Sequence, residues 1–330
     1  MLMRAAPPLL APAGARVVLG SPDIAPLAPA ANTLFGPRGV CFADEALVVA
    51  DTGHHRVLIW QRVPDCDGAP ADVVLGQRDF TTEGRNGLSM PTGVAFADGV
   101  LAVADAWNHR VLLWHGLPRV SNQPPDVVLG SAERAPGDAP RADTLYWCYG
   151  VALHEGRLYV ADTGNRRLLV WQHVPSESGA PADGVLGQPS FETREAAELR
   201  WPHAIAFARG ALLIADAGRN GVLVWRRGEV APECVVGARD CKSPYGLAMP
   251  GDELLVADTA NSRLLGYPGL EPDARPCALA GQAGFADWGD NRWQAPTRES
   301  LCWPYALAAR ANTLAVADSG NNRVLLWDRA

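Results

Sequence analysis

One short pattern recurs six times along the chain and constrains its fold more than any other feature. Each copy has an apolar run that ends in Asp, a short polar turn and a second apolar run. The copies start at Val49, Val103, Val160, Ile214, Val256 and Val316 and read VADTGHHRVLIW, VADAWNHRVLLW, VADTGNRRLLVW, IADAGRNGVLVW, VADTANSRLLGY and VADSGNNRVLLW. β-Branched and aromatic residues in both arms, with Asn, Asp and Gly at the tip, are typical of a β-hairpin.

The spacing of the copies indicates what kind of repeat this is. The Asp that ends the first arm lies at positions 51, 105, 162, 216, 258 and 318, so successive copies are 54, 57, 54, 42 and 60 residues apart. A stack of short helical repeats would hold its period more tightly. The uneven spacing instead indicates a fixed hairpin joined by loops of variable length.

Two further apolar runs accompany the hairpins. A short run, usually introduced by Pro, precedes each one, at 37–43, 91–97, 148–154, 202–208, 244–250 and 304–310. Another run that ends in Gly follows each of the first five, at 73–76, 127–130, 184–187, 234–237 and 277–281. Each unit therefore predicts four strands, named a to d in chain order. Four-stranded sheets repeated around an axis are the blades of a β-propeller.

The number of strands predicts how the ring closes. Residues 16–20 (RVVLG) form a sixth run of type d before the first strand a, whereas the last unit ends after its strand c at Trp327. The N-terminal strand is therefore expected to complete the C-terminal blade and to tie the termini together. This predicts a single all-β, six-bladed propeller domain over residues 16–330. Residues 1–15 are expected to be a disordered or draped N-terminus, of which residues 1–12 are dispensable.

Composition narrows the class of protein. With 48% hydrophobic and 20% charged residues the chain is globular, and its 33 Gly and 27 Pro suit short strands joined by many turns. A net charge of −7, with no run of Lys or Arg longer than a pair, argues against nucleic acid as a partner. No apolar run approaches the ~20 residues needed to span a bilayer. Seven scattered Cys favour reduced thiols in the cytoplasm, with export left open. We expect a cytoplasmic monomer without membrane contact.

The six hairpins resemble the NHL repeat, whose central residues read roughly VADxxNxRV and which folds as a six-bladed propeller. The resemblance covers Arg16 to Trp327. It implies the fold more strongly than a function, because NHL-like propellers include interaction platforms, RNA-binding modules and a few enzymes such as peptidylglycine alpha-amidating lyase.

Residues that recur in nearly every hairpin are expected to be structural. The six Asp side chains are predicted to cap the turn between strands b and c, and the Arg five residues later to pair with that turn or with a neighbouring blade. In the fourth copy Gly221 replaces this Arg, so its turn should be looser or differently bonded. The aromatic residue that ends strand c is assigned to packing between blades; it stands at Trp60, Trp114, Trp171, Trp225, Tyr267 and Trp327.

Binding residues are expected where the blades differ. The residue just before the apolar part of each strand a should stand near the axis, and these six residues form a polar and aromatic ring: Arg38, Thr92, Tyr149, His203, Tyr245 and Tyr305. Four Trp on the same face extend the ring outwards: Trp107, Trp147, Trp201 and Trp303. Such a patch marks a binding site, although these Trp could instead plug the channel mouth. The long loop 281–303, which carries Trp288 and Trp293, could act as a lid.

Two readings of the ring remain open. The favoured one is a binding module for a protein, peptide or small-molecule ligand, with no cofactor. The alternative is an enzyme or metal-handling protein that uses His203, Tyr149 and Arg38. Cys148, His203, Cys241 and Cys302 are the weak candidates for a metal site, but no CxxC or HxxxH pair exists.

Resemblance to the amidating lyase would require several axial His, and a calcium-dependent lactonase would require axial carboxylates. Six of the seven His are expected in turns or outer positions, and no ring residue is acidic. No GxSxG, Walker or HExxH motif is present either.

Overall fold

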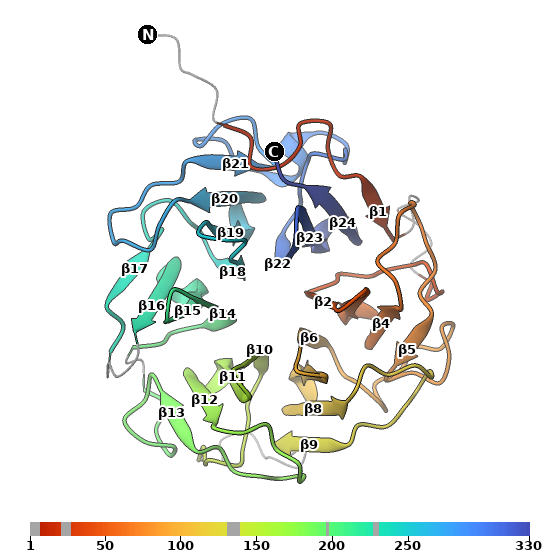
Figure 1. Ribbon diagram of the computed structural model, residues 1–330, viewed down its shortest axis with the longest axis vertical. Coiled ribbons are helices and arrows are strands. Elements are labelled where there is room, and N and C mark those ends of the chain that lie inside the picture. Colours follow the sequence, from red (N-terminus) through yellow and green to blue (C-terminus); the bar gives the residue numbers. More distant parts are fainter. Residues whose placement is uncertain (1–6, 21–27, 131–138, 196–197, 227–230) are drawn as a thin grey trace.

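In the computed structural model, which describes residues 7–20, 28–130, 139–195, 198–226 and 231–330, six four-stranded antiparallel sheets surround a central axis (Figure 1). Blade 1 consists of β2 (Gly39–Ala43), β3 (Ala46–Asp51), β4 (Arg56–Trp60) and β5 (Val73–Leu75). Blade 2 consists of β6 (Pro91–Ala97), β7 (Val100–Asp105), β8 (Arg110–His115) and β9 (Val127–Gly130). Blade 3 consists of β10 (Cys148–His154), β11 (Arg157–Asp162), β12 (Arg167–Trp171) and β13 (Gly184–Leu186). Blade 4 consists of β14 (Pro202–Ala208), β15 (Ala211–Asp216), β16 (Gly221–Arg226) and β17 (Cys234–Val236). Blade 5 consists of β18 (Pro244–Ala248), β19 (Leu254–Asp258), β20 (Arg263–Tyr267) and β21 (Ala278–Ala280). Blade 6 consists of β22 (Pro304–Arg310), β23 (Thr313–Asp318), β24 (Arg323–Asp328) and β1 (Val17–Leu19).

The last blade confirms the predicted closure. Strand β1 pairs antiparallel with β24, with Val17 opposite Leu326 and Leu19 opposite Val324. The first and last strands of the chain therefore lie side by side in one sheet (Figure 1). The six-bladed all-β fold predicted from the repeats is thus confirmed. In each blade the strands run in order from a, near the axis, to d, at the outer edge of the propeller.

The helices of the described residues are 3-10 turns. Six of them connect strands b and c, one per blade: η1 (Thr52–His54), η2 (Ala106–Asn108), η3 (Thr163–Asn165), η4 (Ala217–Arg219), η5 (Thr259–Asn261) and η7 (Ser319–Asn321). The seventh, η6 (Asp290–Trp293), lies in the long loop before blade 6. Within these residues, no helix has the length and apolar character needed to cross a bilayer.

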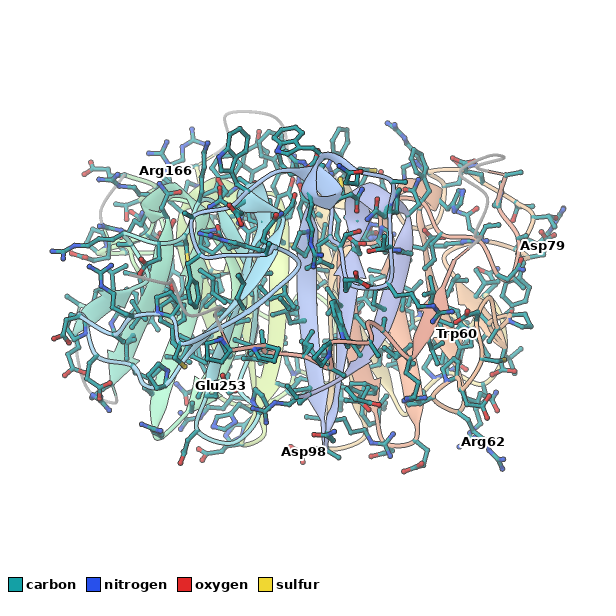
Figure 2. All side chains as sticks on the ribbon, turned by 90° about the horizontal axis from the view of Figure 1, so that it is seen from above. Trp60, Arg62, Asp79, Asp98, Arg166 and Glu253 are labelled. Atoms are coloured by element: carbon teal, nitrogen blue, oxygen red, sulfur yellow. The ribbon has the colours of Figure 1, made fainter. Side chains whose placement is uncertain are left out.

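The propeller has two distinct faces. Turns between strands b and c, together with the loops from d to the next a, form the upper face; turns between a and b form the lower face. Figure 2 shows Arg166, which follows η3, at one face and Asp98, between β6 and β7, at the other.

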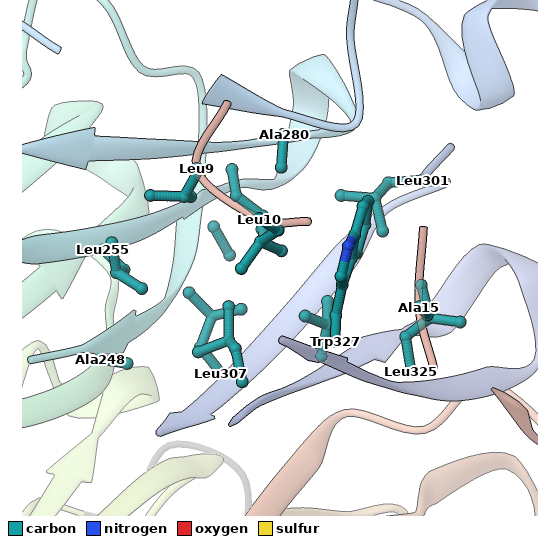
Figure 3. Packing of buried hydrophobic residues seen from close by; sticks show 14 of the residues in the cluster. Leu9, Leu10, Ala15, Ala248, Leu255, Ala280, Leu301, Leu307, Leu325 and Trp327 are labelled. Atoms are coloured by element: carbon teal, nitrogen blue, oxygen red, sulfur yellow. The ribbon is translucent and has the colours of Figure 1, made fainter. Parts of the chain in front are cut away.

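The hydrophobic core lies between neighbouring blades. Between blades 5 and 6, Leu255, Leu307, Leu325 and Trp327 belong to one cluster of buried hydrophobic residues (Figure 3). The aromatic residue that ends strand c is buried in every blade, as predicted. In four blades its indole N–H also donates to a carbonyl of the connection to strand d, over 2.8–3.1 Å: Trp60 to Ala69, Trp114 to Gln123, Trp171 to Ala180 and Trp327 to Ala11.

Residues 7–15 take the part of a missing connection in blade 6. Leu9 and Leu10 are buried in the core between blades 5 and 6 (Figure 3). Leu9 N–H donates to the carbonyl of Leu279 over 3.0 Å, so this segment also lies along the outer strand of blade 5. Residues 1–6 lie outside the described residues. The packing of residues 7–15 revises the expectation that residues 1–12 are dispensable.

Each recurring Asp lies in a buried network, which in blade 3 centres on Asp162. Its carboxylate accepts the backbone N–H of Tyr146, in the loop before strand a, over 2.6 Å. It also accepts the Asn165 amide and the Arg167 Nε–H, each over 2.7 Å. The loop donors that correspond to Tyr146 in blades 1, 2, 5 and 6 are Phe35, Ser89, Lys242 and Cys302.

This bonding corrects the predicted role of the Asp residues. They do not cap the turn that follows them, since only Asp216 accepts a backbone N–H of its own turn, from Gly218 over 3.0 Å. Instead they tie the hairpin to the incoming loop, and the Arg extends this link. The guanidinium of Arg167 donates to the carbonyls of Arg141 and Thr144, over 2.9 and 2.8 Å.

Blade 4 is differently bonded, as its sequence predicted. Asp216 accepts the backbone N–H groups of both Arg200 and Trp201, over 2.7 and 2.8 Å. Arg219, in the place of the usual Asn, donates to the carbonyl of Glu198 over 2.7 Å. Arg219 thus supplies the contact to the incoming loop that the Arg five residues after the Asp makes in other blades.

We predict that Asp162→Ala destabilises the protein by about 3 to 5 kcal/mol, because it leaves the buried Arg167 guanidinium without its counter-charge. Urea unfolding measures this change. Asp79→Ala, which removes the exposed pair with Arg78 and the bonds from Thr81, is the matched control and should leave the unfolding curve nearly unchanged. Equal small losses in both variants would contradict the role assigned to the network.

We also predict that removing residues 1–20 exposes the edge of β24 and causes aggregation, since the blade then lacks its outer strand. Removing only residues 1–12 keeps β1 but deletes Leu9 and Leu10, so the melting temperature should fall without aggregation. Size-exclusion chromatography and thermal unfolding test both variants. A soluble protein of residues 21–330 with the melting temperature of the full chain would overturn the closure.

Candidate functional site

A narrow axial cavity of about 100 Å³ opens among the strands a of all six blades. The six predicted ring residues all line it: Arg38, Thr92, Tyr149, His203, Tyr245 and Tyr305. Strand a begins beside the axis in every blade, so residues at one repeat position converge there. Drug-sized ligands occupy pockets of roughly 300–1,000 Å³. The cavity is therefore too small to enclose such a ligand.

Ring side chains stack on one another around the axis. The His203 imidazole lies parallel to the Tyr245 ring, with 4.1 Å between centroids. Tyr245 contacts Tyr305 at 4.7 Å, and the Arg38 guanidinium lies 4.7 Å from the Tyr305 ring centroid. Tyr149 contacts the other side of the series, 4.9 Å from His203. These contacts join blades 3, 4, 5, 6 and 1 in one aromatic and cationic series.

Thr92 differs from the other ring residues. It is buried, and its hydroxyl donates to the carbonyl of Tyr149 over 2.8 Å. Its hydrogen bond therefore links blades 2 and 3 and is not directed at a ligand.

The electrostatics of the ring favour neutral groups. Burial lowers the pKa of His203 to about 4, partly offset by the Trp201 carbonyl, and the positive charge of Arg38 lowers it further. His203 Nδ1 lies 3.0 Å from that carbonyl, so Nδ1 carries the proton and Nε2 is left as an acceptor. Burial also raises the pKa of Tyr245 to about 12. At neutral pH the ring thus offers hydroxyl groups, one imidazole acceptor and the charge of Arg38.

The four Trp predicted to surround the ring on the upper face are called the rim Trp: Trp107, Trp147, Trp201 and Trp303. Three of them expose large parts of their side chains. Trp107, on η2, is 47% exposed, and Trp201 and Trp303 are 39% and 42% exposed. The Arg85 guanidinium lies 5.7 Å from the Trp107 ring centroid. Trp147 is half-buried because it stacks on Tyr146, with 4.9 Å between centroids.

The backbone at the rim is held by the preceding blade, a link that sequence reasoning missed. Trp147 N–H donates to His109 Nδ1 over 3.1 Å, and Trp303 N–H donates to the Ser262 hydroxyl over 3.2 Å. Both acceptors stand four residues after the recurring Asp, at a left-handed position that ends the 3-10 turn. The corresponding pairs in blades 1, 2 and 5 are Gly36 with Asn322, Met90 with His55 and Ser243 with Asn220.

Trp201 shows what happens when this acceptor is absent. Arg166 occupies the equivalent position in blade 3 and has no acceptor atom. Trp201 N–H instead bonds to Asp216 of its own blade over 2.8 Å. In five of the six blades the position four residues after the recurring Asp is filled by His, Asn or Ser. This recurrence of an acceptor side chain was the signal for the link in the sequence.

The long loop 281–303 is anchored to the turns of blades 5 and 6. Asp290 accepts the Ser262 hydroxyl over 2.7 Å, and the side-chain amides of Asn291 and Asn321 pair over 2.8 Å. Trp288 and Trp293 project from this loop, are exposed and meet edge to face at 5.2 Å. The loop therefore adds two aromatic side chains to the upper face beside blade 6, while its predicted motion as a lid stays a prediction.

The weak metal candidates are not brought together. Cys148 Sγ donates to the Arg110 carbonyl over 3.3 Å, and Cys241 Sγ lies 3.4 Å from the Tyr267 hydroxyl. Burial raises the pKa of both thiols and of Cys302. Within the described part of the chain, no group of three or more His, Cys, Asp or Glu side chains is placed to hold a metal ion.

A larger cavity, of about 730 Å³, lies between blades 3 and 4 and reaches the lower face at their a-to-b turns. Its wall includes strand β13 and the aromatic residues Tyr159, Phe207 and Trp225. No sequence expectation pointed to this place.

Three solved structures share the architecture. Catalytically inactive virginiamycin B lyase from Staphylococcus aureus with quinupristin matches with a TM-score of 0.52 and 10% identity, over 91% of this chain and 86% of that chain. A protein of unknown function from Bacteroides thetaiotaomicron matches with a TM-score of 0.54 and 14% identity, over 96% of this chain and 75% of that chain. The WD40 propeller domain of Doa1 matches with a TM-score of 0.54 and 11% identity, over 96% of each chain. At these identities the likeness shows the fold alone. A search among curated proteins found no match.

The sequence of blade 2 matches a known repeat. Residues 88–112, which cover strand a and most of the hairpin, match the NHL repeat. The five other copies of this hairpin occupy equivalent places in the six-bladed ring. The chain is therefore an NHL-type β-propeller.

Proposed function

We propose that the protein is an interaction module whose upper face binds a protein or peptide partner. The observation that carries the proposal is the exposure of Trp107, Trp201 and Trp303 on one face, at 39–47% of each side chain. Exposed aromatic residues of this size are the commonest hot spots of protein interfaces.

The rim backbone supports a binding role for these side chains. Other blades place Gly36, Met90 or Ser243 where blades 4 and 6 have Trp201 and Trp303. The backbone links to the preceding blade form with each of these smaller residues. The backbone links therefore do not require an indole at these positions, which supports a surface contact as its role.

The size of the axial cavity selects the class of partner. About 100 Å³ does not enclose a drug-sized molecule, so a partner covers the ring instead of entering it. Tyr305, Arg38 and the neutral His203 would then meet the partner at the centre of the face, with the rim Trp around them. A protein or peptide surface fits this layout better than a small ligand.

An enzyme remains the second candidate, because His203, Tyr149 and Arg38 converge on the cavity. A general base works best when its pKa lies near the operating pH. With a pKa of about 4, His203 is a weak base at neutral pH. The ring thus suits hydrogen bonding to a bound partner better than proton transfer.

A double variant, Trp201→Ser with Trp303→Ser, tests the role of the rim Trp. Ser is chosen because blade 5 has Ser243 at the equivalent position. The free energy of unfolding should change by less than about 1 kcal/mol, whereas binding of a partner captured with the unmodified protein should weaken by about 2 kcal/mol or more. Quantitative mass spectrometry of captured proteins, followed by calorimetry with the purified partner, measures the loss. Val120→Ser, at an exposed apolar residue away from the rim, is the control and should bind as the unmodified protein does. A double variant that melts several degrees lower yet binds fully would show that these Trp only plug the channel.

The neutral state of His203 is tested by the pH dependence of stability. The pKa is about 4 in the folded protein, against 6.5 as the ordinary value, so only the unfolded chain gains this proton between these values. Stability from this residue is complete above pH 6.5 and falls as the pH drops towards 4, by about 2 to 3 kcal/mol. The His203→Gln variant should lack this component in urea unfolding at a series of pH values. Parallel pH profiles of the two proteins would show that His203 titrates normally.

A further inference from the structure

The outer edges of several blades are covered by the connection between strands c and d of the next blade. Val74, in the middle of β5, donates its N–H to the Ser121 hydroxyl over 3.2 Å, and its carbonyl accepts the N–H of Asn122 over 2.7 Å. The same pair of bonds joins Val18 to Asp67 and Gly68, and Val128 to Ser178 and Gly179.

A three-residue unit makes these contacts each time. A short acceptor side chain comes first, and a residue with positive φ follows: Gly68, Asn122 or Gly179. The third residue offers its carbonyl to the indole N–H of its own blade. The unit thus satisfies three polar groups, two on the neighbouring edge strand and one on the buried Trp.

Among the described residues of blade 4, no such unit is found. Eight residues, 226–233, separate Trp225 from strand β17, against twelve in each of blades 1 to 3. Residues 227–230 lie outside the described residues, and none of the residues described makes the three bonds. Val185, in the middle of β13, has no partner for its outward N–H and carbonyl within the described chain. Trp225 Nε1 is buried, in a side chain 3% exposed, and has no hydrogen-bond partner.

The cavity between blades 3 and 4 lies where the unit would be. Its wall contains all of β13 and the Trp225 side chain, so the free edge and the unpaired indole border the same space of about 730 Å³. Gly184, where blades 1 and 2 have Val73 and Val127, widens the space along the strand. In blade 5, by contrast, the equivalent aromatic Tyr267 is paired with Cys241.

We propose that this cavity binds an extended peptide segment of another protein, which adds to β13 and bonds to Trp225 as the missing unit would. The segment carries Ser or Asp, then Gly, then a small residue, because those residue types make the three bonds in blades 1 and 3. Main-chain bonds to a free strand edge supply affinity, and pockets for side chains supply specificity.

Charge adds a preference for an acidic segment. Arg157, Arg209 and Arg226 line the cavity, against Glu155 alone among the acidic residues of its wall. Arg209 and Arg226 already pair with Asp252 and Glu233, whereas Arg157 has no ion pair with any described residue. An acidic side chain beside the Ser-Gly pair would meet Arg157 at the rim of the cavity.

The test uses a fluorescent peptide with the sequence of the chain's own blade 3 connection, HVPSESGAPAD (residues 173–183), and the full-length protein. Fluorescence anisotropy should show saturable binding. The Trp225→Phe variant, which removes the indole N–H together with part of the buried ring, should weaken it about five- to tenfold, as the loss of one buried hydrogen bond does. Its melting temperature should fall less than that of Trp171→Phe, since Trp225 Nε1 has no partner to lose in the free protein.

Trp171→Phe is the matched control. It removes the indole donor that bonds to Ala180, so it should lower the melting temperature and leave peptide affinity unchanged. A peptide with Val in place of its Gly should bind poorly, because Val disfavours the positive φ that Gly179 adopts. No saturable binding at millimolar peptide, which is also the result if a second copy or the chain's own connection fills the cavity, would overturn the proposal. Equal binding by Trp225→Phe would overturn it as well.

Discussion

The buried pair between the recurring Asp and the Arg five residues later is the interaction on which the upper face depends. In blade 3, Asp162 and Arg167 together bond to three backbone groups of the incoming loop, at Tyr146, Arg141 and Thr144. That loop carries Trp147 and leads into β10, which carries the ring residue Tyr149. Because burial raises the pKa of Asp162 in spite of Arg167, the pair has a large desolvation cost. Its main effect is therefore to fix where the loop lies.

A rigid scaffold of this kind lets a few positions vary without disturbing the others. At the upper face, the residue before strand a keeps its backbone bond whether it is Gly36, Ser243 or Trp303. At the outer edge of the propeller, the connection of blade 4 is four residues shorter, and a strand edge and an indole N–H have no partners among the described residues, while blade 4 keeps its four strands. Both proposed binding sites are thus local departures from a repeated structure.

The candidate site could be predicted in part because one repeat position maps to one place in a ring. Arg38, Tyr149 and His203 come from different blades, yet the repeat register alone predicted that they converge on the axis. The roles of individual side chains were less predictable. An Asp before a turn is a common cap, and nothing local reveals that Asp162 bonds instead to a residue 16 positions earlier. For the same reason, the buried place of Leu9 and Leu10 could not be read from an N-terminal segment rich in Pro and Ala.

The sequence by itself determined the number of blades, the order of their strands and the closure by β1, because these follow from periodicity and from a count of apolar runs. It also determined which residues approach the axis. Tertiary structure decided the width of the channel, the exposure of the rim Trp and the cavity beside β13. These depend on contacts among side chains and loops that the repeat pattern does not specify, since Trp147 is half-buried against Tyr146 whereas Trp107 is 47% exposed. Trp171 and Trp225 occupy the same position of strand c, yet the indole N–H of Trp171 bonds to Ala180 whereas that of Trp225 has no partner.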